Sequence, residues 1–264
     1  MSTAVRTATY TLYRGTSPLL VSLPHDGSEI PADIAVRMAA PAQAAPDTDW
    51  HVSRLYAFAR DELGASLLVP RFSRYVVDLN RPPDDASLYP GRNTTGLCPV
   101  QAFSGDAIYL AGQMPDAGEI DARRERYWRP YHRALVDEIQ RLRDAHGRVL
   151  LWEGHSIRGD GLPFLFDGRL PDLNLGTADG TSCGADVRRQ LLAVLAEQAA
   201  YDWVVDGRFK GGYITRQYGR PGEGVHAVQL ELSQRTYMDE ASTAYDAARA
   251  DRLIPLLSRL LDVS

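Results

Sequence analysis

Two histidines follow short apolar segments of the chain and stand near a glycine. His25 comes after the apolar residues 19–23, and His155 comes after the mostly apolar residues 148–152. A short apolar run that ends in a polar loop is typical of a buried strand, so both imidazoles are expected at strand ends. A catalytic zinc takes three protein ligands, often histidines, and keeps one position open for water. The pair therefore indicates a metal site that needs one further ligand.

The third ligand is expected to be a carboxylate, and spacing alone does not identify it. The candidates are Asp26, Glu29, Asp47, Asp49 and Glu153. Two of them, Asp47 and Asp49, stand at the start of a predicted helix. An aspartate in that position usually accepts a backbone amide as a helix cap, so a purely structural role stays open for either.

One glutamate in a predicted strand is a candidate general base. Glu231 lies within the apolar residues 228–232. Burying a carboxylate is costly unless the group is paired or functional. Alternation along a strand also allows another interpretation, in which Glu231 and Gln229 share a solvated face.

Arginines flank a third apolar segment. Arg74 and Arg81 stand on either side of residues 75–79. A planar guanidinium can bind a carboxylate through two parallel hydrogen bonds, so either residue could hold an acidic substrate or pair with a carboxylate of the chain. Lys210 is the only lysine among 29 basic residues, so the abundance of arginine by itself indicates no function.

The composition excludes several classes of protein. The 264 residues carry 34 acidic and 29 basic side chains, and this net charge of −5 gives no basic surplus for nucleic acid or an anionic membrane. Two cysteines, Cys98 and Cys183, cannot form a disulfide framework and are expected to pack. The apolar runs fall short of the roughly 20 residues of a membrane span. The amino terminus lacks the apolar core of a signal peptide, which favours a cytoplasmic protein.

Apolar patterning predicts alternating strands and helices. The strands are expected over 19–23, 66–70, 75–79, 148–152, 203–205 and 227–232, and the helices over 49–63, 117–146, 186–199 and 242–261. This order favours a single domain over 1–264, an α/β fold whose mostly parallel mixed sheet is flanked by helices on both faces. Ligands of such sheets bind at the carboxyl ends of the strands. Four strands are expected to bring reactive residues there, namely His25, Arg81, His155 and Glu231.

Several local features refine this assignment. Pro130 should break or kink its helix, or start a second helix. His132 lies in the same helical segment and is expected at the surface or in packing. Ser242 is a plausible cap for the last helix. Residues 84–115 and 158–183 are predicted as loops, and the glycines and polar residues of 211–216 predict a mobile loop. The chain lacks a phosphate-binding glycine motif and a serine nucleophile elbow.

Eight segments together resemble the N-formylglutamate amidohydrolase family. In chain order they are VSLPHDGSEIP (21–31), DTDWHVSRLY (47–56), SRYVVDLNRPP (73–83), ERYWRPYHRAL (125–135), LWEGHSI (151–157), LPDLNLGTADGTSC (170–183), GGYITRQYG (211–219) and VQLELSQRTYMDE (228–240). They span nearly the whole chain. The family in turn is similar to zinc carboxypeptidases and aspartoacylases, so the resemblance implies a zinc-carboxypeptidase-like fold.

The resemblance also implies a set of metal ligands. His25 and His155 correspond to the two zinc histidines. Carboxypeptidases place the acidic ligand three residues after the first histidine, where this chain has Ser28. The acidic ligand must therefore lie elsewhere, and Asp49 is favoured over Asp47. Glu153 precedes the second histidine closely and is expected to orient it.

The implied activity is the hydrolysis of N-formyl-L-glutamate to formate and L-glutamate, a step of histidine degradation. One divalent ion, zinc by expectation, would activate water, and Glu231 would accept the proton. The residues expected to bind the anionic substrate are Arg74, Asn80, Arg81, Tyr213 and Arg216. Two other functions stay open, namely an amidohydrolase for a different N-acyl amino acid and a non-catalytic domain that binds acidic ligands. The sequence does not indicate the oligomeric state.

Overall fold

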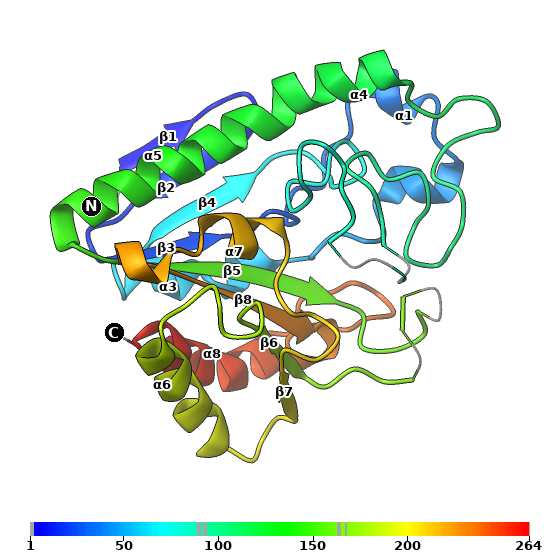
Figure 1. Cartoon of the computed structure of the whole chain (residues 1–264). Coiled ribbons are helices and arrows are strands. Elements are labelled where there is room, and N and C mark those ends of the chain that lie inside the picture. The colour runs from blue at the N-terminus through cyan, green and yellow to red at the C-terminus, as the bar shows by residue number, and fades with distance from the viewer. Residues whose placement is uncertain (1–2, 89–90, 92–93, 163–164, 167, 264) are drawn as a thin grey trace.

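The computed structural model describes residues 3–88, 91, 94–162, 165–166 and 168–263, and these form one sheet of eight strands (Figure 1). The strands are β1 (Thr3–Arg6), β2 (Tyr10–Arg14), β3 (Leu19–Ser22), β4 (Ser66–Pro70), β5 (Val149–Ile157), β6 (Leu173–Gly176), β7 (Trp203–Val205) and β8 (Val225–Ser233). Their order across the sheet is β1-β2-β4-β3-β5-β8-β6-β7. The central strands β4, β3, β5 and β8 run parallel, whereas β2 and β6 pair antiparallel with β4 and β8. The predicted mixed, mostly parallel α/β sheet is therefore confirmed.

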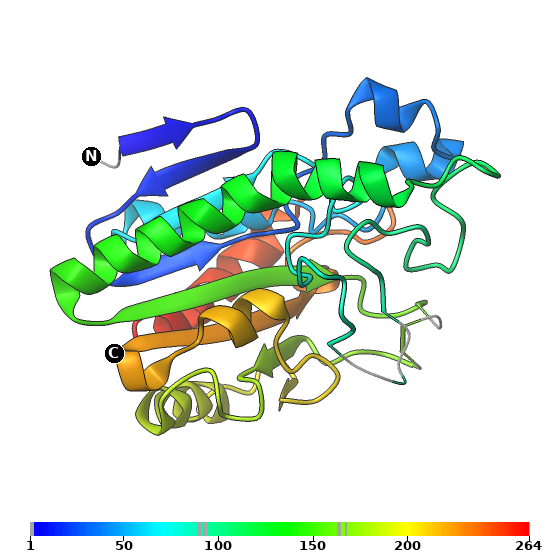
Figure 2. The ribbon, with the colours of Figure 1, turned by 45° about the horizontal axis from the view of Figure 1, so that its top comes forward.

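Helices cover both faces of the sheet. They are α1 (Ala32–Ala35), η1 (Ala40–Ala44), α2 (Val52–Leu55), α3 (Ala57–Asp61), α4 (Ala117–Arg123), η2 (Arg124–Trp128), α5 (Arg129–His146), α6 (Ala185–Ala196), α7 (Tyr213–Tyr218), η3 (Pro221–Glu223), η4 (Gln234–Thr236) and α8 (Ala247–Leu261). In Figure 2, α5 and α7 lie in front of the sheet and α8 lies behind it. The apolar residues of α2, α3 and α6 pack in the same core as those of α8.

Strand residues alternate between these two cores. Leu151 of β5 packs on the side of α5 and α7, and Trp152 packs on the side of α3 and α8. All nine residues of β5 are buried, because this strand lies at the centre of the sheet and both of its faces are covered. A strand buried on both faces often contains a continuous apolar run, which explains why residues 148–152 could be predicted as a strand from the sequence.

The helical segment predicted over 117–146 is divided close to Pro130, as expected. A π-helical turn, η2, separates α4 from α5, and Pro130 lies in the first turn of α5. A proline is tolerated there because the first amides of a helix have no partner within the helix. Pro130 therefore lies at the start of a second helix, and the helical backbone continues from α4 through η2 into α5 without a gap.

Residues 75–79 do not form the predicted strand. They form tight turns, in which the amide of Val76 donates to Ser73 and the amide of Arg81 donates to Asp78. Their apolar side chains are buried in the core beneath α5. The segment has the apolar composition of a strand, but its backbone hydrogen bonds go to turns, loops and side chains and not to a neighbouring strand.

The predicted helix over 49–63 is instead two short helices, α2 and α3. His51, just before α2, has a left-handed backbone with φ of 64°. Asp26 caps α2 by accepting the amide of Ser53 at 2.8 Å. Asp47 and Asp49, which precede α2 in the chain, are therefore available for other contacts.

The last helix begins later than the predicted range of 242–261. Asp246 caps α8 by accepting the amide of Arg249 at 3.0 Å. Ser242 is not the cap, because its hydroxyl donates to Asp239 in the preceding turn. The cap prediction was wrong because more than one residue in this segment could serve.

Other elements were not predicted. β6 lies within the predicted loop over 158–183, and β1 and β2 form an edge of the sheet without a long apolar run. Residues 211–216 include the start of α7, where Ile214 and Thr215 are buried, so the predicted mobile loop is wrong. The described residues between 84 and 115 form no helix or strand. Within the part of the chain that the structure describes, no helix is long and apolar enough to cross a membrane.

Candidate active site

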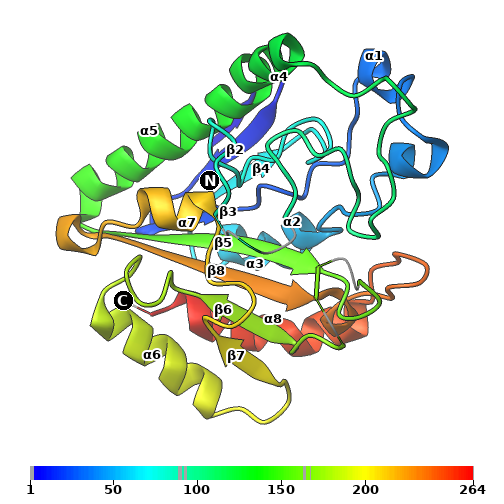
Figure 3. The same ribbon diagram turned by 45° about the vertical axis from the view of Figure 1, so that its right-hand side comes forward.

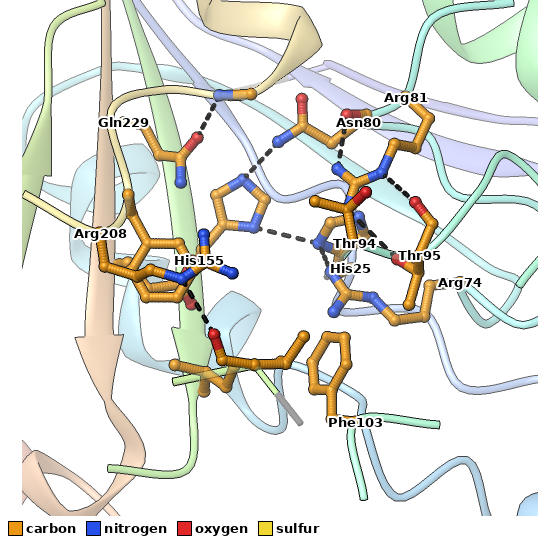
Figure 4. Close-up of a pocket in the computed structure, with 15 residues that line it drawn as sticks. His25, Arg74, Asn80, Arg81, Thr94, Thr95, Phe103, His155, Arg208 and Gln229 are labelled. Carbon is orange, nitrogen blue, oxygen red and sulfur yellow. Dashed lines mark hydrogen bonds between the residues drawn. The ribbon is translucent and has the colours of Figure 1, made fainter. Parts of the chain in front are cut away.

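The parallel strands β3, β5 and β8 lie side by side (Figure 3), and a cavity opens where they end (Figure 4). His25 comes shortly after Ser22, the last residue of β3. His155 in β5 and Glu231 in β8 occupy paired positions of neighbouring strands. The cavity volume is about 80 Å³. Its lining consists of His25, Arg74, Asn80, Arg81, Thr94, Thr95, Phe103, His155, Ile157, Leu165, Arg208, Phe209, Gly212, Gln229 and Glu231.

Two histidines and one aspartate meet at the base of this cavity. His25, Asp49 and His155 are each no more than 3% exposed. Nδ1 of His25 lies 3.1 Å from Nδ1 of His155. Oδ2 of Asp49 lies 3.1 Å from Nδ1 of His155 and 3.8 Å from Nδ1 of His25. One ligand atom from each of the three residues lies within 4.8 Å of the others, so the group could hold a metal ion.

The second nitrogen of each imidazole bonds to another carboxylate. Nε2 of His25 lies 2.6 Å from Oδ1 of Asp78, and Nε2 of His155 lies 2.8 Å from Oε1 of Glu153. A carboxylate accepts hydrogen bonds, so Nε2 carries the proton and Nδ1 presents a lone pair. In the neutral imidazoles, two Nδ1 lone pairs and the oxygen of Asp49 therefore converge, and a shared cation would stabilise this arrangement.

The electrostatics of this group favour a bound positive charge. Burial alone would lower the pKa of His155, but hydrogen bonds to Asp49 and Glu153 outweigh burial and raise that pKa to about 10. Asp49 also accepts the backbone amide of Ser156 at 3.0 Å, which fixes its orientation. A proton or a metal ion can supply this positive charge. Two imidazole nitrogens and a carboxylate oxygen that converge on one point fit a metal ion.

Glu231 lies beside these ligands without a protein cation bonded to it in the described residues. Its position in β8 pairs with that of His155 in β5, so both side chains leave the sheet on the same face. Burial raises the pKa of the Glu231 carboxyl to about 8. A buried carboxyl with a raised pKa at a cavity wall is a typical proton acceptor.

The amino end of α7 holds two side chains of the site. The amide of Ile214 donates to Oδ1 of Asn80 at 2.9 Å, and the amide of Thr215 donates to Oε2 of Glu153 at 3.1 Å. The hydroxyl of Thr215 donates to the same oxygen of Glu153. A Cβ on Gly212 would lie 2.3 Å from Nδ2 of Asn80, so this close approach requires glycine.

Two arginines from the turn after β4 reach the cavity. The guanidinium of Arg74 contacts Nδ1 of His25 and lies 3.9 Å from Oδ1 of Asp49. Arg81 donates through Nε to the backbone oxygen of Thr95 at 2.7 Å and through Nη2 to its hydroxyl at 3.2 Å. These contacts hold the guanidinium of Arg81 at the cavity wall (Figure 4).

Three of the five residues predicted to bind substrate line the cavity, namely Arg74, Asn80 and Arg81. Tyr213 does not line it, and its ring packs against His132 with centroids 5.6 Å apart. Arg216 does not line it either, and its Nε donates to the backbone oxygen of Gly211 at 2.9 Å. A substrate-binding role for these two residues stays a prediction.

Three residues near the site were not identified from the sequence. Asp78 was treated as part of a strand, and the turn that it occupies instead directs it to His25. Gln229 shares a face with Glu231, as alternation predicted, but this face lines the cavity and is buried. Arg208 lines the opposite wall of the cavity from Arg81, and no local pattern distinguished it from other arginines (Figure 4).

Similarity to known proteins covers almost the whole chain. A chain 50% identical over 250 residues is an N-formylglutamate deformylase of Pseudomonas aeruginosa, and the match covers 94% of this chain and 93% of that protein. An N-formylglutamate deformylase of Pseudomonas putida is 49% identical over 228 residues, with 86% of this chain and 84% of that protein covered.

A solved structure and a family model agree with these relatives. The crystal structure of N-formylglutamate amidohydrolase from Ralstonia eutropha JMP134 matches with a TM-score of 0.81 and 28% identity, over 97% of this chain and 96% of that chain. The family model for N-formylglutamate amidohydrolase matches residues 17–238, which include every candidate ligand and cavity residue named above. The chain belongs to the N-formylglutamate amidohydrolase family.

Proposed function

We propose that this protein catalyses the metal-dependent hydrolysis of N-formyl-L-glutamate to formate and L-glutamate. The observation that carries the proposal is the convergence of His25, Asp49 and His155 beside Glu231 in an arginine-lined cavity. Such a set supplies the parts that metal-assisted amide hydrolysis needs. Two relatives about half identical to this chain are named for the deformylation of N-formylglutamate, which supports this substrate.

His25, Asp49 and His155 would hold one divalent ion, and we propose zinc. Two imidazoles and one carboxylate are ligands that zinc accepts, and three protein ligands leave a position open. When bound, the ion would act as a Lewis acid that polarises the formyl carbonyl and makes water more acidic. Asp78 and Glu153 orient the two imidazoles through their Nε2 atoms.

Glu231 is the proposed general base and general acid. Its carboxylate takes a proton from the attacking water as the oxygen bonds to the formyl carbon. The protonated carboxyl then gives this proton to the amide nitrogen, and the bond between that nitrogen and the formyl carbon breaks. Formate and the free amino group of glutamate result, so the hydrolysis is balanced by one water molecule.

The two carboxylates of the substrate require cations inside the cavity, because an unpaired buried charge is costly. Arg81 and Arg208 line opposite walls, and Arg74 lies between the metal ligands and the ring of Phe103. We propose that Arg81, together with Asn80, binds one carboxylate and that Arg208 contributes to binding the other.

Formate release from N-formyl-L-glutamate tests this function. We expect the protein to release formate, to lose this activity when a chelator removes the metal, and to regain it when zinc is added back. Absence of release from metal-loaded protein would overturn the substrate assignment. Release only from substrates with longer acyl groups would indicate another N-acyl amino acid, and binding of these substrates without turnover would indicate a non-catalytic domain.

Replacing Arg81 by lysine should impair the enzyme although the charge is kept. The guanidinium of Arg81 already bonds to Thr95 through two nitrogens, and a lysine ammonium cannot hold these bonds and present a planar pair of donors as well. We expect KM for N-formyl-L-glutamate to rise by about tenfold, as loss of one charge-assisted hydrogen bond implies. An unchanged kcat/KM in the Arg81→Lys variant would reject this role.

Replacing Glu153 by glutamine should weaken metal binding. The carboxylate of Glu153 accepts from Nε2 of His155 and from Thr215, and glutamine offers only one oxygen for these donors. Loss of an outer partner of a metal-bound histidine typically lowers metal affinity by roughly 10–100-fold. Competition with a chromophoric chelator measures this affinity. A zinc affinity equal to that of the unmodified protein would show that Glu153 does not orient the ligand.

A further inference from the structure

Two side chains from the continuous helical segment of η2 and α5 form hydrogen bonds to the backbone on both sides of Asn80. Nε1 of Trp128 donates to the backbone oxygen of Arg81 at 3.0 Å. Nε2 of His132 lies 2.9 Å from the backbone oxygen of Leu79. Trp128 and His132 are four residues apart, so they share one face of the helix, and their rings stack with centroids 3.6 Å apart.

The protonation of this imidazole follows from its partners. A backbone oxygen accepts only, so Nε2 of His132 carries the proton and donates to Leu79. Nδ1 then accepts from the hydroxyl of Tyr218 in α7, at 2.8 Å. Burial keeps the imidazole neutral, because it lowers the pKa of His132 to about 3. The side chain therefore has one defined tautomer with a fixed donor.

The turn is also held from α7. The amide of Ile214 fixes the side chain of Asn80, whose Nδ2 lies 3.2 Å from Nε2 of His155. The rings of Tyr213 and Tyr218 pack on His132. The side chains of η2, α5 and α7 thus enclose the Asn80 turn, and neither Trp128 nor His132 lines the cavity.

We propose that Trp128 and His132 are positioning residues, which clamp the peptide carbonyls on either side of Asn80 and thereby set where Asn80 and Arg81 meet the substrate. The inference rests on the proposed substrate-binding role of those two residues. A guanidinium at the end of a long side chain moves with its backbone, and a displacement of about 1 Å in a binding group can cost on the order of 10²-fold in rate. The two hydrogen bonds to the carbonyls of Leu79 and Arg81 oppose such a displacement.

Two replacements of His132 separate the clamp from packing. The amide nitrogen of glutamine reaches the position of Nε2, so His132→Gln keeps a donor for Leu79. Asparagine is shorter and reaches only the position of Nδ1, so His132→Asn keeps a partner for Tyr218 and loses the donor. We expect His132→Asn to raise KM for N-formyl-L-glutamate about tenfold with a smaller change in kcat, as the loss of one buried hydrogen bond implies. His132→Gln should stay within about threefold of the unmodified enzyme.

A second donor and a matched control complete the design. Trp128→Phe removes the donor to Arg81 and should raise KM in the same direction. Glu138 is fully buried on the same helix but binds Ser66 and Arg141 away from the cavity, so Glu138→Gln should change the melting temperature and leave KM unchanged. Zinc content should equal that of the unmodified protein in all four variants, because none of them removes a metal ligand or its partner.

A double variant tests whether the clamp acts through Arg81. If it does, His132→Asn should raise KM much less in an Arg81→Ala background than in the unmodified enzyme, because coupled residues are not additive. Equal KM values for His132→Asn and His132→Gln, with Arg81→Ala impaired, would overturn the clamp alone. No formate release by the unmodified protein, or an unchanged KM in Arg81→Ala, would overturn the proposed function and the clamp with it.

Discussion

Replacing Glu231 by glutamine is expected to lower kcat for formate release by about 10²–10⁴-fold, the usual contribution of a general acid–base group. Glutamine keeps the size and polarity of the side chain but cannot accept a proton from water. The lining of the cavity and the three metal ligands should be unaffected, so zinc content and KM should change little. Steady-state kinetics and metal analysis of the same preparation measure both quantities.

The pH dependence gives a second measure of the same group. Glu231 must be ionised to accept a proton, so kcat/KM should fall as the pH drops through its pKa. Burial raises that pKa to about 8, and a bound cation nearby would shift it back toward the ordinary value of about 4.3. We therefore expect the acid limb between these two values, and we expect the Glu231→Gln variant to lack it.

Glu138→Gln serves as the control for Glu231→Gln. Both residues are buried glutamates, but Glu138 bonds to Arg141 and to Ser66 at the amino end of β4, away from the cavity at the carboxyl ends of the strands. A decrease in kcat of similar size in the control would mean that loss of a buried carboxylate, rather than loss of the base, explains the effect. Activity close to normal in Glu231→Gln would reject the general-base role directly.

Replacing Asp49 by asparagine is expected to abolish metal binding and, with it, formate release. A carboxylate oxygen of Asp49 is the third donor of the proposed ligand group, and Oδ2 also accepts the amide of Ser156. A neutral amide can still accept from Ser156 but is a weak ligand. The loss of metal affinity should exceed the roughly 10–100-fold loss expected for an outer partner such as Glu153. Zinc titration against a competing chelator measures it.

Asp47→Asn is the matched control for this variant. Oδ2 of Asp47 accepts the hydroxyl of Tyr75 at 2.6 Å and the amide of Phe103 at 2.8 Å, so this carboxylate is directed away from the ligands. We expect the control to bind zinc as the unmodified protein does, with at most a lower melting temperature. Loss of zinc from Asp47→Asn together with retention by Asp49→Asn would reverse the ligand assignment.

Local sequence patterns were sufficient for the central strands of the sheet and for several residues of the site. His25 and His155 could be selected because each follows an apolar run, and the buried central strands β3 and β5 begin with such runs. Glu231 was recognisable because a carboxylate in such a segment is costly to bury. The resemblance of eight segments in order was sufficient for the family, and the comparisons confirmed it.

The same local patterns misassigned segments whose structure depends on distant partners. Residues 75–79 have the composition of a strand but pack beneath α5 without one, and residues 211–216 include the start of a helix where glycines suggested a mobile loop. In both cases the deciding contacts come from elements far away in the chain. Periodicity reports which side of a segment is buried, and it does not report what covers that side.

The sequence alone therefore determined the fold class and the family, and it singled out His25 and His155 as candidate ligands. These conclusions depend on patterns within short segments. Only the tertiary structure decided that Asp49, rather than Asp47, faces both imidazoles. It also decided that Asp78 and Glu153 hold their outer nitrogens. The physical reason is that a loop carboxylate is directed by the hydrogen bonds that it finds after docking, and the donors for those bonds come from segments distant in the chain.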